Sequence, residues 1–323
     1  MRKSSQIRAA QVSGVSARLQ LLLLRVAAAV PNFLEYPGMR RLTRAVALFF
    51  NNQNTAVLEL PSGGRLEIYL NDGYWSKLLK KGFTYEPELD FVLKCVLTQP
   101  DTYFLDCGAN IGYWSVIASR FLPPGRVIAL EASPPQFERL RRNAKLNENR
   151  FETILGALWS HDGDTLVIVT NERSHAGSSI VNWREKTGQT GYREYSVESV
   201  TIDSVCDRCI PSRDAKIVIK LDVEGAEVQA LEGARDVLSS RDVVVHYEDH
   251  GQDSSCKASA FFIENLNFDV FYCDEHNTVM RMDSIADVRK VKIRTSIGYN
   301  FHACSRDSVF SRMLASRAKS IGA

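Results

Sequence analysis

Two acids that each follow a short apolar run are the residues best suited to bind a nucleoside. Asp106 comes directly after Tyr103–Leu105, and Glu131 comes directly after Arg126–Leu130. If both runs are strands of one parallel sheet, their carboxyl ends meet at the edge where such sheets bind ligands. A carboxylate at the end of the second strand is placed to accept hydrogen bonds from ribose hydroxyl groups. The two acids therefore predict a nucleoside site at one edge of a sheet.

The turn after Asp106 indicates which nucleoside-containing cofactor the site would bind. It contains Gly108 and Gly112, which let the backbone approach a ligand closely, and the helix expected from about Asn110 presents free N–H groups there. A dinucleotide fingerprint has three glycines spaced for a pyrophosphate, whereas this turn has two. A carboxylate is unfavourable beside a pyrophosphate and favourable beside the α-ammonium group of an amino-acid cofactor. We therefore expect S-adenosyl-L-methionine as the cofactor, with a nicotinamide-dependent oxidoreductase as the alternative.

A second group of polar residues could carry the chemistry of transfer. Asp222 and Glu224 follow the apolar run Lys216–Leu221, and His246 ends the next such run. Carboxylates and imidazoles are the usual general bases, and imidazole titrates near neutral pH. We expect Asp222 or Glu224 to orient or deprotonate the acceptor, with His246 as the next candidate and Lys220 holding the carboxylates. No metal is expected, because the polar residues after His246 alternate between two faces of an extended segment.

With these motifs the sequence resembles the FkbM family of methyltransferases over roughly residues 56–250. Five segments carry the resemblance: Gly82–Leu89, Asp106–Gly112, Glu131–Pro134, Val200–Ser204 and Ile219–Glu227. The last is the most specific, because few other methyltransferases read Asp-Val-Glu-Gly there. The resemblance implies methylation of a hydroxyl group, with sugars and secondary metabolites among the acceptors. A non-catalytic binding protein that keeps the fold is a further alternative, because fold alone does not determine function.

Four more residues are assigned to the cofactor site, each with a simpler structural alternative. Glu86 belongs to the first family segment, although an acid in the first turn also stabilises a helix. Asn110 could serve only as a helix cap. Ser133 stands before Pro134 at the expected start of a helix, with a capping-box glutamine three residues later. Ala157 is small where an adenine ring could rest, and packing would explain it as well.

Strand-like and helix-like segments alternate through the middle of the chain. The expected core strands are residues 103–105, 126–130, 153–159, 216–221 and 242–246. Strands that alternate with helices of this length predict an α/β fold with a doubly wound, mostly parallel sheet, the Rossmann-like class I methyltransferase architecture. A β-hairpin and a helix precede this core, and Asp162–Gly163 predicts a second hairpin. Val270–Tyr272 and Ser308–Phe310 are strand-like and could complete the sheet.

The chain divides into three expected regions: an N-terminal helical extension (1–55), a methyltransferase domain (56–310) and a C-terminal tail (311–323). The apolar run that begins at Leu19 is interrupted by Arg25 and is too short for a spanning helix, which needs about 20 apolar residues. The basic segment Arg40–Phe50 could lie on a membrane surface. We adopt the alternative that it packs on the catalytic domain or a partner subunit.

The overall charge gives no case for a nucleic-acid partner. Lys and Arg number 40 against 38 Asp and Glu, so the basic surplus typical of such proteins is missing, and a small-molecule or glycan acceptor is expected. The seven cysteines are scattered, and the pair Cys206–Cys209 lacks the second pair that a zinc site needs. Reduced cysteines predict a cytoplasmic protein.

Overall fold

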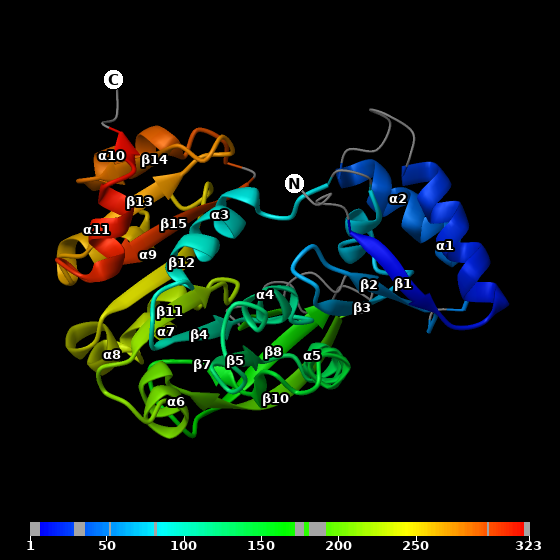
Figure 1. The fold of residues 1–323 in the computed structure, drawn as a ribbon, viewed down its shortest axis with the longest axis horizontal. Helices are drawn as coiled ribbons and strands as arrows, with labels where there is room; N and C mark the ends of the chain where they lie inside the picture. Colours follow the sequence, from blue (N-terminus) through cyan, green and yellow to red (C-terminus); the bar gives the residue numbers. More distant parts are fainter. Residues whose placement is uncertain are drawn as a thin grey trace.

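The core of the protein is one large sheet, seen in a computed structural model that describes residues 7–28, 36–51, 53–80, 83–171, 178–180, 192–295 and 297–319 (Figure 1). Within these residues the strand order is β16-β14-β13-β15-β12-β11-β4-β5-β6. The strands are β4 (Thr102–Cys107), β5 (Val127–Glu131), β6 (Glu152–Leu155), β11 (Lys216–Leu221), β12 (Val243–His250), β13 (Asp269–Cys273), β14 (Val279–Met282), β15 (Gly298–Cys304) and β16 (Ala318–Lys319). The five strands from β6 to β12 are parallel, and β15 is antiparallel to both neighbours. The predicted doubly wound, mostly parallel α/β sheet is confirmed.

Helices cover both faces of this sheet, because successive strand residues point to opposite sides. Phe104 packs into the same apolar cluster as the helices α3 (Pro87–Val96), α4 (Tyr113–Ala118) and α5 (Pro134–Leu146). Its neighbour Leu105 packs with α6 (Ile202–Cys209), α7 (Glu227–Glu232) and α8 (Arg235–Ser240). Gly233 separates α7 from α8, and a Cβ there would lie 2.2 Å from the carbonyl oxygen of Trp159.

The strand register aligns four polar residues across the sheet. Lys220 on β11 is paired with Asp106 on β4 and with His246 on β12. His246 is in turn opposite His302 on β15. Residues paired in register share one face of a sheet. This row of side chains lies near the carboxyl ends of the parallel strands, where the site is expected.

A smaller sheet lies beside the core and overturns one expectation. Its order is β7-β10-β8-β9, with bounds β7 (Ala157–Leu158), β8 (Thr165–Asn171), β9 (Ser178–Ile180) and β10 (Tyr192–Val200). The hairpin expected at Asp162–Gly163 is wrong, because β10 lies between β7 and β8 and pairs with both. The Asp162 carboxylate instead accepts hydrogen bonds from Thr201 N at 2.7 Å and Ser204 Oγ at 2.8 Å. It therefore holds the start of α6.

The N-terminal region is a helix pair on a small sheet. Its elements are β1 (Arg8–Val12), α1 (Val15–Ala28), α2 (Tyr36–Ala47), β2 (Thr55–Glu59), β3 (Arg65–Tyr69) and the 3-10 helix η1 (Trp75–Leu79). The expected β2–β3 hairpin forms. The expectation of a wholly helical extension is wrong at β1, which pairs antiparallel with β2. Because that pairing crosses residue 55, the extension is joined to the next region by backbone hydrogen bonds. No helix in the described residues has the length and apolarity to cross a membrane.

The C-terminal residues also differ from expectation. The strand expected at Ser308–Phe310 is the start of helix α11 (Val309–Ala315), and Ser308 Oγ caps it by accepting from Ser311 N at 2.9 Å. The buried side chains Phe310 and Leu314 pack into the core, and β16 pairs with β14. Residues 311–319 therefore belong to the sheet domain rather than to a separate tail.

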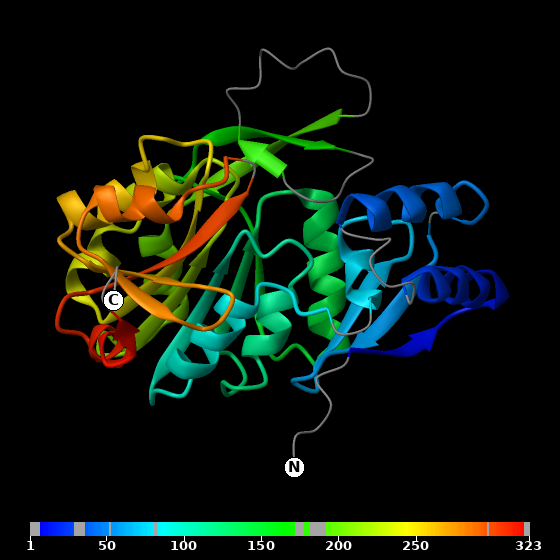
Figure 2. The ribbon, with the colours of Figure 1, turned by 90° about the horizontal axis from the view of Figure 1, so that it is seen from above.

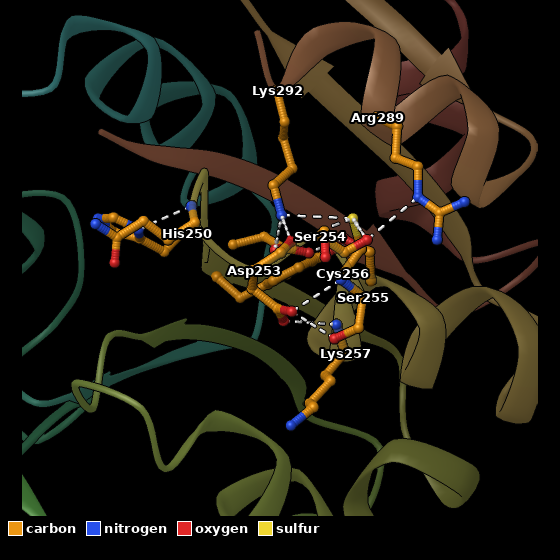
Figure 3. Close-up of polar contacts among 12 residues, drawn as sticks. His250, Asp253, Ser254, Ser255, Cys256, Lys257, Arg289 and Lys292 are labelled. Atoms are coloured by element: carbon orange, nitrogen blue, oxygen red, sulfur yellow. Dashed lines mark hydrogen bonds and ion pairs between the residues drawn. The ribbon is translucent and has the colours of Figure 1, made fainter. Parts of the chain in front are cut away.

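A polar network closes the loop that follows β12 (Figure 3). The Asp253 carboxylate accepts from the backbone nitrogens of Ser255 at 2.9 Å and Lys257 at 3.1 Å. Lys292, at the end of helix α10 (Ile285–Val291), donates to the carbonyl oxygen of Asp253 at 2.7 Å and to the carboxylate of Asp249. Both charged groups of this ion pair are buried. The loop beside the carboxyl end of β12 is thus tied to α10.

Candidate functional site

A cavity lies at the carboxyl ends of β4, β5 and β11. Its volume is about 870 Å³ when the open space at its mouth is included. Six residues predicted to bind or transform a ligand line it: Asp106, Gly108, Asn110, Glu131, Asp222 and Glu224. The cavity therefore brings together the two groups of acids that the sequence separates by about a hundred residues.

The turn after β4 needs glycine for two separate reasons. Gly108 has a φ of +81°, and a Cβ there would lie 1.8 Å from the carbonyl oxygen of Asp222. Gly112 has a φ of +88°, and a Cβ would lie 2.6 Å from Leu140 Cδ1. Both backbone conformations are ones that other residues rarely adopt. The first glycine lets the turn pack against the backbone of Asp222, and the second lets α4 begin at Tyr113 against α5.

Glu131 is held in place by backbone donors. One carboxylate oxygen accepts from Asn110 N at 2.8 Å, and the other accepts from Ser133 N at 2.8 Å. Each oxygen keeps a second lone pair for a ligand hydroxyl. Burial raises the pKa of Glu131 to about 7, although both backbone bonds favour the ionised form. The carboxylate is thus prepared to accept hydrogen bonds at the end of β5.

Asp106 has an oxygen that remains available. Its Oδ2 accepts from Ser115 Oγ at 2.5 Å, whereas its Oδ1 is buried and has no hydrogen-bond partner among the described residues. Burial raises the pKa of Asp106, and Lys220 and Ser115 oppose that shift. A buried acceptor without a partner costs free energy of about 1–3 kcal/mol. A bound donor would remove that cost.

An aromatic wall completes the cavity, and the sequence reasoning missed it. It consists of Tyr74, Trp75, Tyr85, Tyr113 and Trp114. Trp75 and Tyr113 stack with ring centroids 5.8 Å apart, and Tyr85 meets Tyr113 edge-on at 5.0 Å. A signal was present in the sequence, because the tetrapeptide Gly-Tyr-Trp-Ser occurs twice, at 73–76 and 112–115. Aromatic faces of this kind attract cations and stack on planar rings.

Two predicted cofactor residues support this wall. Glu86 accepts from Trp114 Nε1 at 2.8 Å, and Asn110 Oδ1 accepts from Trp75 Nε1 at 3.2 Å. The helix-cap alternative for Asn110 is therefore not what the structure shows, since α4 begins after Gly112. Glu86 has a φ of +42° at the start of α3, and burial raises its pKa. Gly82, the first residue of the same family segment, lies outside the described residues.

Lys220, near the end of β11, is a cation that lines the cavity. Its Nζ is 3.0 Å from Asp222 Oδ2, and its side chain is 8% exposed. Burial alone would lower the pKa of Lys220, but Asp222, Asp106 and Glu86 outweigh it and raise the pKa above its ordinary value. Lys220 therefore stays protonated and cannot act as a base. Its ammonium group donates a hydrogen bond to the carboxylate of Asp222.

Two glutamates near Asp222 have pKa values close to neutrality. Glu224 is exposed at the mouth of the cavity, and desolvation by its surroundings together with the charges of Asp222 and Glu227 raises its pKa to about 7. Burial and the charges of Asp222 and Glu224 raise the pKa of Glu248, on β12, to about 8. General bases work best when their pKa is near the operating pH. Glu224 fits this requirement and lines the cavity, and Glu248 adds negative charge beside it.

His246 lies elsewhere than expected. It does not line the cavity, and its buried ring has Nδ1 at 2.5 Å from Nδ1 of His302. Burial, His302 and Lys220 together lower the pKa of His246 well below its ordinary value. The prediction of His246 as the next candidate base is therefore wrong, because the ring is buried against the neighbouring strand.

Ala157 and Ser133 also need correction. Ala157 is buried in a small cluster with Ile168 and Val197, while its neighbours Gly156 and Leu158 line the cavity. Alternation along an extended chain explains this, since adjacent residues point to opposite sides. Ser133 does begin α5, but its Oγ makes no capping bond, and its contribution is the backbone N–H given to Glu131.

A doubly wound sheet with a ligand cavity at the carboxyl ends of its strands makes this chain a Rossmann-like α/β protein. The family model described as the Methyltransferase FkbM domain matches residues 106–270, about half of the chain. The chain therefore belongs to this family, as the sequence motifs indicated.

One curated protein and two solved structures illustrate what the chain is similar to. The chain is 25% identical to Methyltransferase 1 of Beauveria bassiana (strain ARSEF 2860) in a 167-residue alignment that covers 45% of this chain and 65% of that protein. The structure of methyltransferase FkbM from Methylobacillus flagellatus KT is similar with 14% identity and a TM-score of 0.35, covering 72% of this chain and 55% of that one. SMU.1697c from Streptococcus mutans, a putative methyltransferase in complex with SAH, has 12% identity and a TM-score of 0.39, covering 69% and 98%.

Proposed function

We propose that the protein is an S-adenosyl-L-methionine-dependent methyltransferase that methylates a hydroxyl group of a small-molecule or glycan acceptor. The observation that carries this proposal is the pairing of Asp106, with its unpartnered buried oxygen, and Glu131 in one aromatic-walled cavity. Asp106 suits an ammonium or other cationic donor, and Glu131 suits ribose hydroxyls. When bound, the cofactor supplies an electrophilic methyl group on a sulfonium centre.

The charge of the cavity supports this cofactor over a nicotinamide dinucleotide. Among the residues that line it, Lys220 is the single cation, and it is already engaged by carboxylates. A pyrophosphate would meet Asp106, Asp222 and Glu224 with little positive charge to compensate them. The same acids disfavour a nucleic-acid acceptor, because its phosphates would be repelled. Free cysteines throughout are in keeping with a cytoplasmic protein.

The residues on the acceptor side suggest a division of labour. Asp222, held by Lys220, orients the acceptor hydroxyl. With the cofactor bound, the acceptor oxygen would form its bond to the methyl group as the bond from that methyl group to the sulfonium sulfur breaks. Glu224 would take the proton of the acceptor hydroxyl, so the products would be the methylated acceptor, neutral S-adenosylhomocysteine and a protonated Glu224. Proximity and orientation supply much of the remaining rate.

Ligand-dependent stability tests the proposal. We expect S-adenosylhomocysteine to raise the free energy of unfolding by about 2.7 kcal/mol at 100 times its dissociation constant, and NAD to leave it unchanged. Asp106→Asn should weaken S-adenosylhomocysteine binding at least tenfold, whereas Glu138→Gln, on an exposed surface of α5, should not. Thermal melting and calorimetry measure both effects. Stabilisation by NAD alone would point to the oxidoreductase, and binding without any methyl transfer would point to a non-catalytic protein.

A further inference from the structure

Helix α1 has two apolar faces, and only one of them is buried. Its inner residues Ala17, Leu21, Leu24 and Ala28 pack into the core. Its outer face carries five exposed apolar side chains: Val15 (82% exposed), Leu19 (50%), Leu22 (57%), Leu23 (44%) and Val26 (61%). A surface helix of a globular protein normally presents polar residues on its outer side. Packing on the catalytic domain therefore accounts for the inner face alone.

The five outer residues form one continuous surface, the α1 stripe. Their spacing of three and four residues places them along one side of the helix, opposite the buried residues. Leu48 and Phe49, which follow α2, are 84% and 82% exposed and add apolar surface in the same region. Helices α1 and α2 lie at the end of the molecule farthest from α10 and α11 (Figures 1 and 2). Among the described residues the α1 stripe is thus exposed at one end of the molecule, where a large flat surface could contact it.

Charge identifies that partner. Residues 1–55 contain eight Lys and Arg residues and one acid, Glu35, for a net charge of +7. The whole chain has a net charge of +2, so residues 56–323 carry −5. Arg18 and Arg25 are exposed and flank one side of the α1 stripe, and Arg41 on α2 is exposed as well. Basic residues beside an apolar helix face are typical of a helix that lies in the interface of an anionic membrane.

We propose that α1, with Leu48 and Phe49, docks the protein onto an anionic lipid surface, lying in the plane of the interface. The exposed apolar side chains enter the boundary between headgroups and acyl chains, and the arginines contact lipid phosphates. A second copy of the chain fits this surface less well, because two regions with a charge of +7 would face each other. None of the residues of the α1 stripe lines the cavity, whose lining begins at Tyr74.

Vesicle flotation with the full chain tests docking. We expect binding to phosphatidylcholine vesicles that contain about 30% phosphatidylserine, at least tenfold weaker binding to pure phosphatidylcholine, and a marked loss at high salt. The variant Leu19→Gln/Leu22→Gln/Val26→Gln should bind the anionic vesicles at least tenfold less. Arg18→Glu/Arg25→Glu should remove the preference for anionic lipid.

A matched control separates docking from general surface hydrophobicity. Leu155→Gln/Val167→Gln/Ile293→Gln changes three other exposed apolar residues and should bind as the parent does. Unchanged melting temperatures show that the variants fold. Parent protein that fails to bind, or a stripe variant that binds fully, overturns the proposal. A dimer in light scattering that the stripe variant abolishes, without vesicle binding, would assign the stripe to a second copy instead.

Discussion

Asp222 and Glu224 follow the same strand, yet their carboxylates meet different surroundings. Asp222 accepts a hydrogen bond from Lys220, so its charge is compensated. Glu224 has a φ of +51° in the turn before Gly225, and desolvation together with neighbouring acids raises its pKa to about 7. A carboxylate that loses its proton near pH 7 is a better proton acceptor than one held by an ammonium group. Asp222 is therefore a candidate positioning residue, and Glu224 is a candidate base.

The pH dependence of the chemical step tests this separation. Glu224 must be ionised to act as a base, so the single-turnover rate should rise as pH increases through about 7. Glu224→Gln should lower the rate by about 10²–10⁴-fold and remove that rise. Asp222→Asn should lower the rate and keep a rise with pH, but at lower pH, because the charge of Asp222 no longer raises the pKa of Glu224. If Glu224→Gln keeps the parental pH profile, another group takes the proton.

Sequence reasoning reached the acids of the site because strand ends can be read from local patterns. It could not place His246, since the residue that buries it, His302, comes 56 positions later on an antiparallel strand. The prediction that Ala157 lines the cofactor site differs from the structure by one position, because a shift of one residue along a strand changes the face on which a side chain lies. Contacts between distant segments thus limit what a single sequence predicts about individual side chains.

At the scale of elements, the cofactor turn and the end of β11 are packed backbone against backbone. Gly108→Ala should destabilise the protein through both its positive φ and the clash with Asp222 O. Gly163 is a matched control, because it has a φ of +83° and open space around it. We expect Gly163→Ala to cost about 1–2 kcal/mol and Gly108→Ala at least about 2 kcal/mol more. Denaturant unfolding measures both, and equal losses would show that the turn can relax.

The loop after β12 depends on a buried ion pair between elements. Lys292→Met leaves the carboxylate of Asp249 buried without its cation, which should cost about 3–5 kcal/mol of unfolding free energy. Lys290→Met is the control, because its pair with Asp287 is on the surface and should contribute less than about 0.5 kcal/mol. Urea unfolding compares the two variants. A small effect at Lys292 would mean that water or a repacked loop replaces the lysine.

At the scale of the whole molecule, the sequence predicted the alternation of strands and helices and a mostly parallel core sheet. It did not predict the second sheet, because β10 inserts between β7 and β8 from about thirty residues away. The strand-like run at Phe310 formed a helix, since Ser308 caps it and its apolar residues pack at helical spacing. Local sequence patterns therefore predict the alternating strands and helices of the core. The second sheet depends on pairing between segments that are distant in the sequence.

The acids of the site also make the free energy of unfolding of the whole protein depend on pH. Glu131, Glu224 and Glu248 have pKa values raised to about 7, 7 and 8, so the folded state holds these protons more tightly than the unfolded chain. Their contribution is present at low pH and is lost as pH rises from about 4.5 to 8. The lowered pKa values of His246 and His302 act in the opposite direction, but only below about 6.5, where an unfolded histidine gains its proton.

Above pH 6.5 the glutamates therefore dominate, and the free energy of unfolding should fall between pH 6.5 and 8.5. Glu248→Gln removes a carboxylate that is repelled by the charges of Asp222 and Glu224. The free energy of unfolding of this variant should therefore fall by about 1–2 kcal/mol less than that of the parent between pH 6.5 and 8.5. Glu138→Gln changes an exposed glutamate and should follow the parent. Urea unfolding at pH 6.5, 7.5 and 8.5 provides the comparison. A parental stability that stays level or rises across this range would show that the acids of the cavity ionise without mutual repulsion.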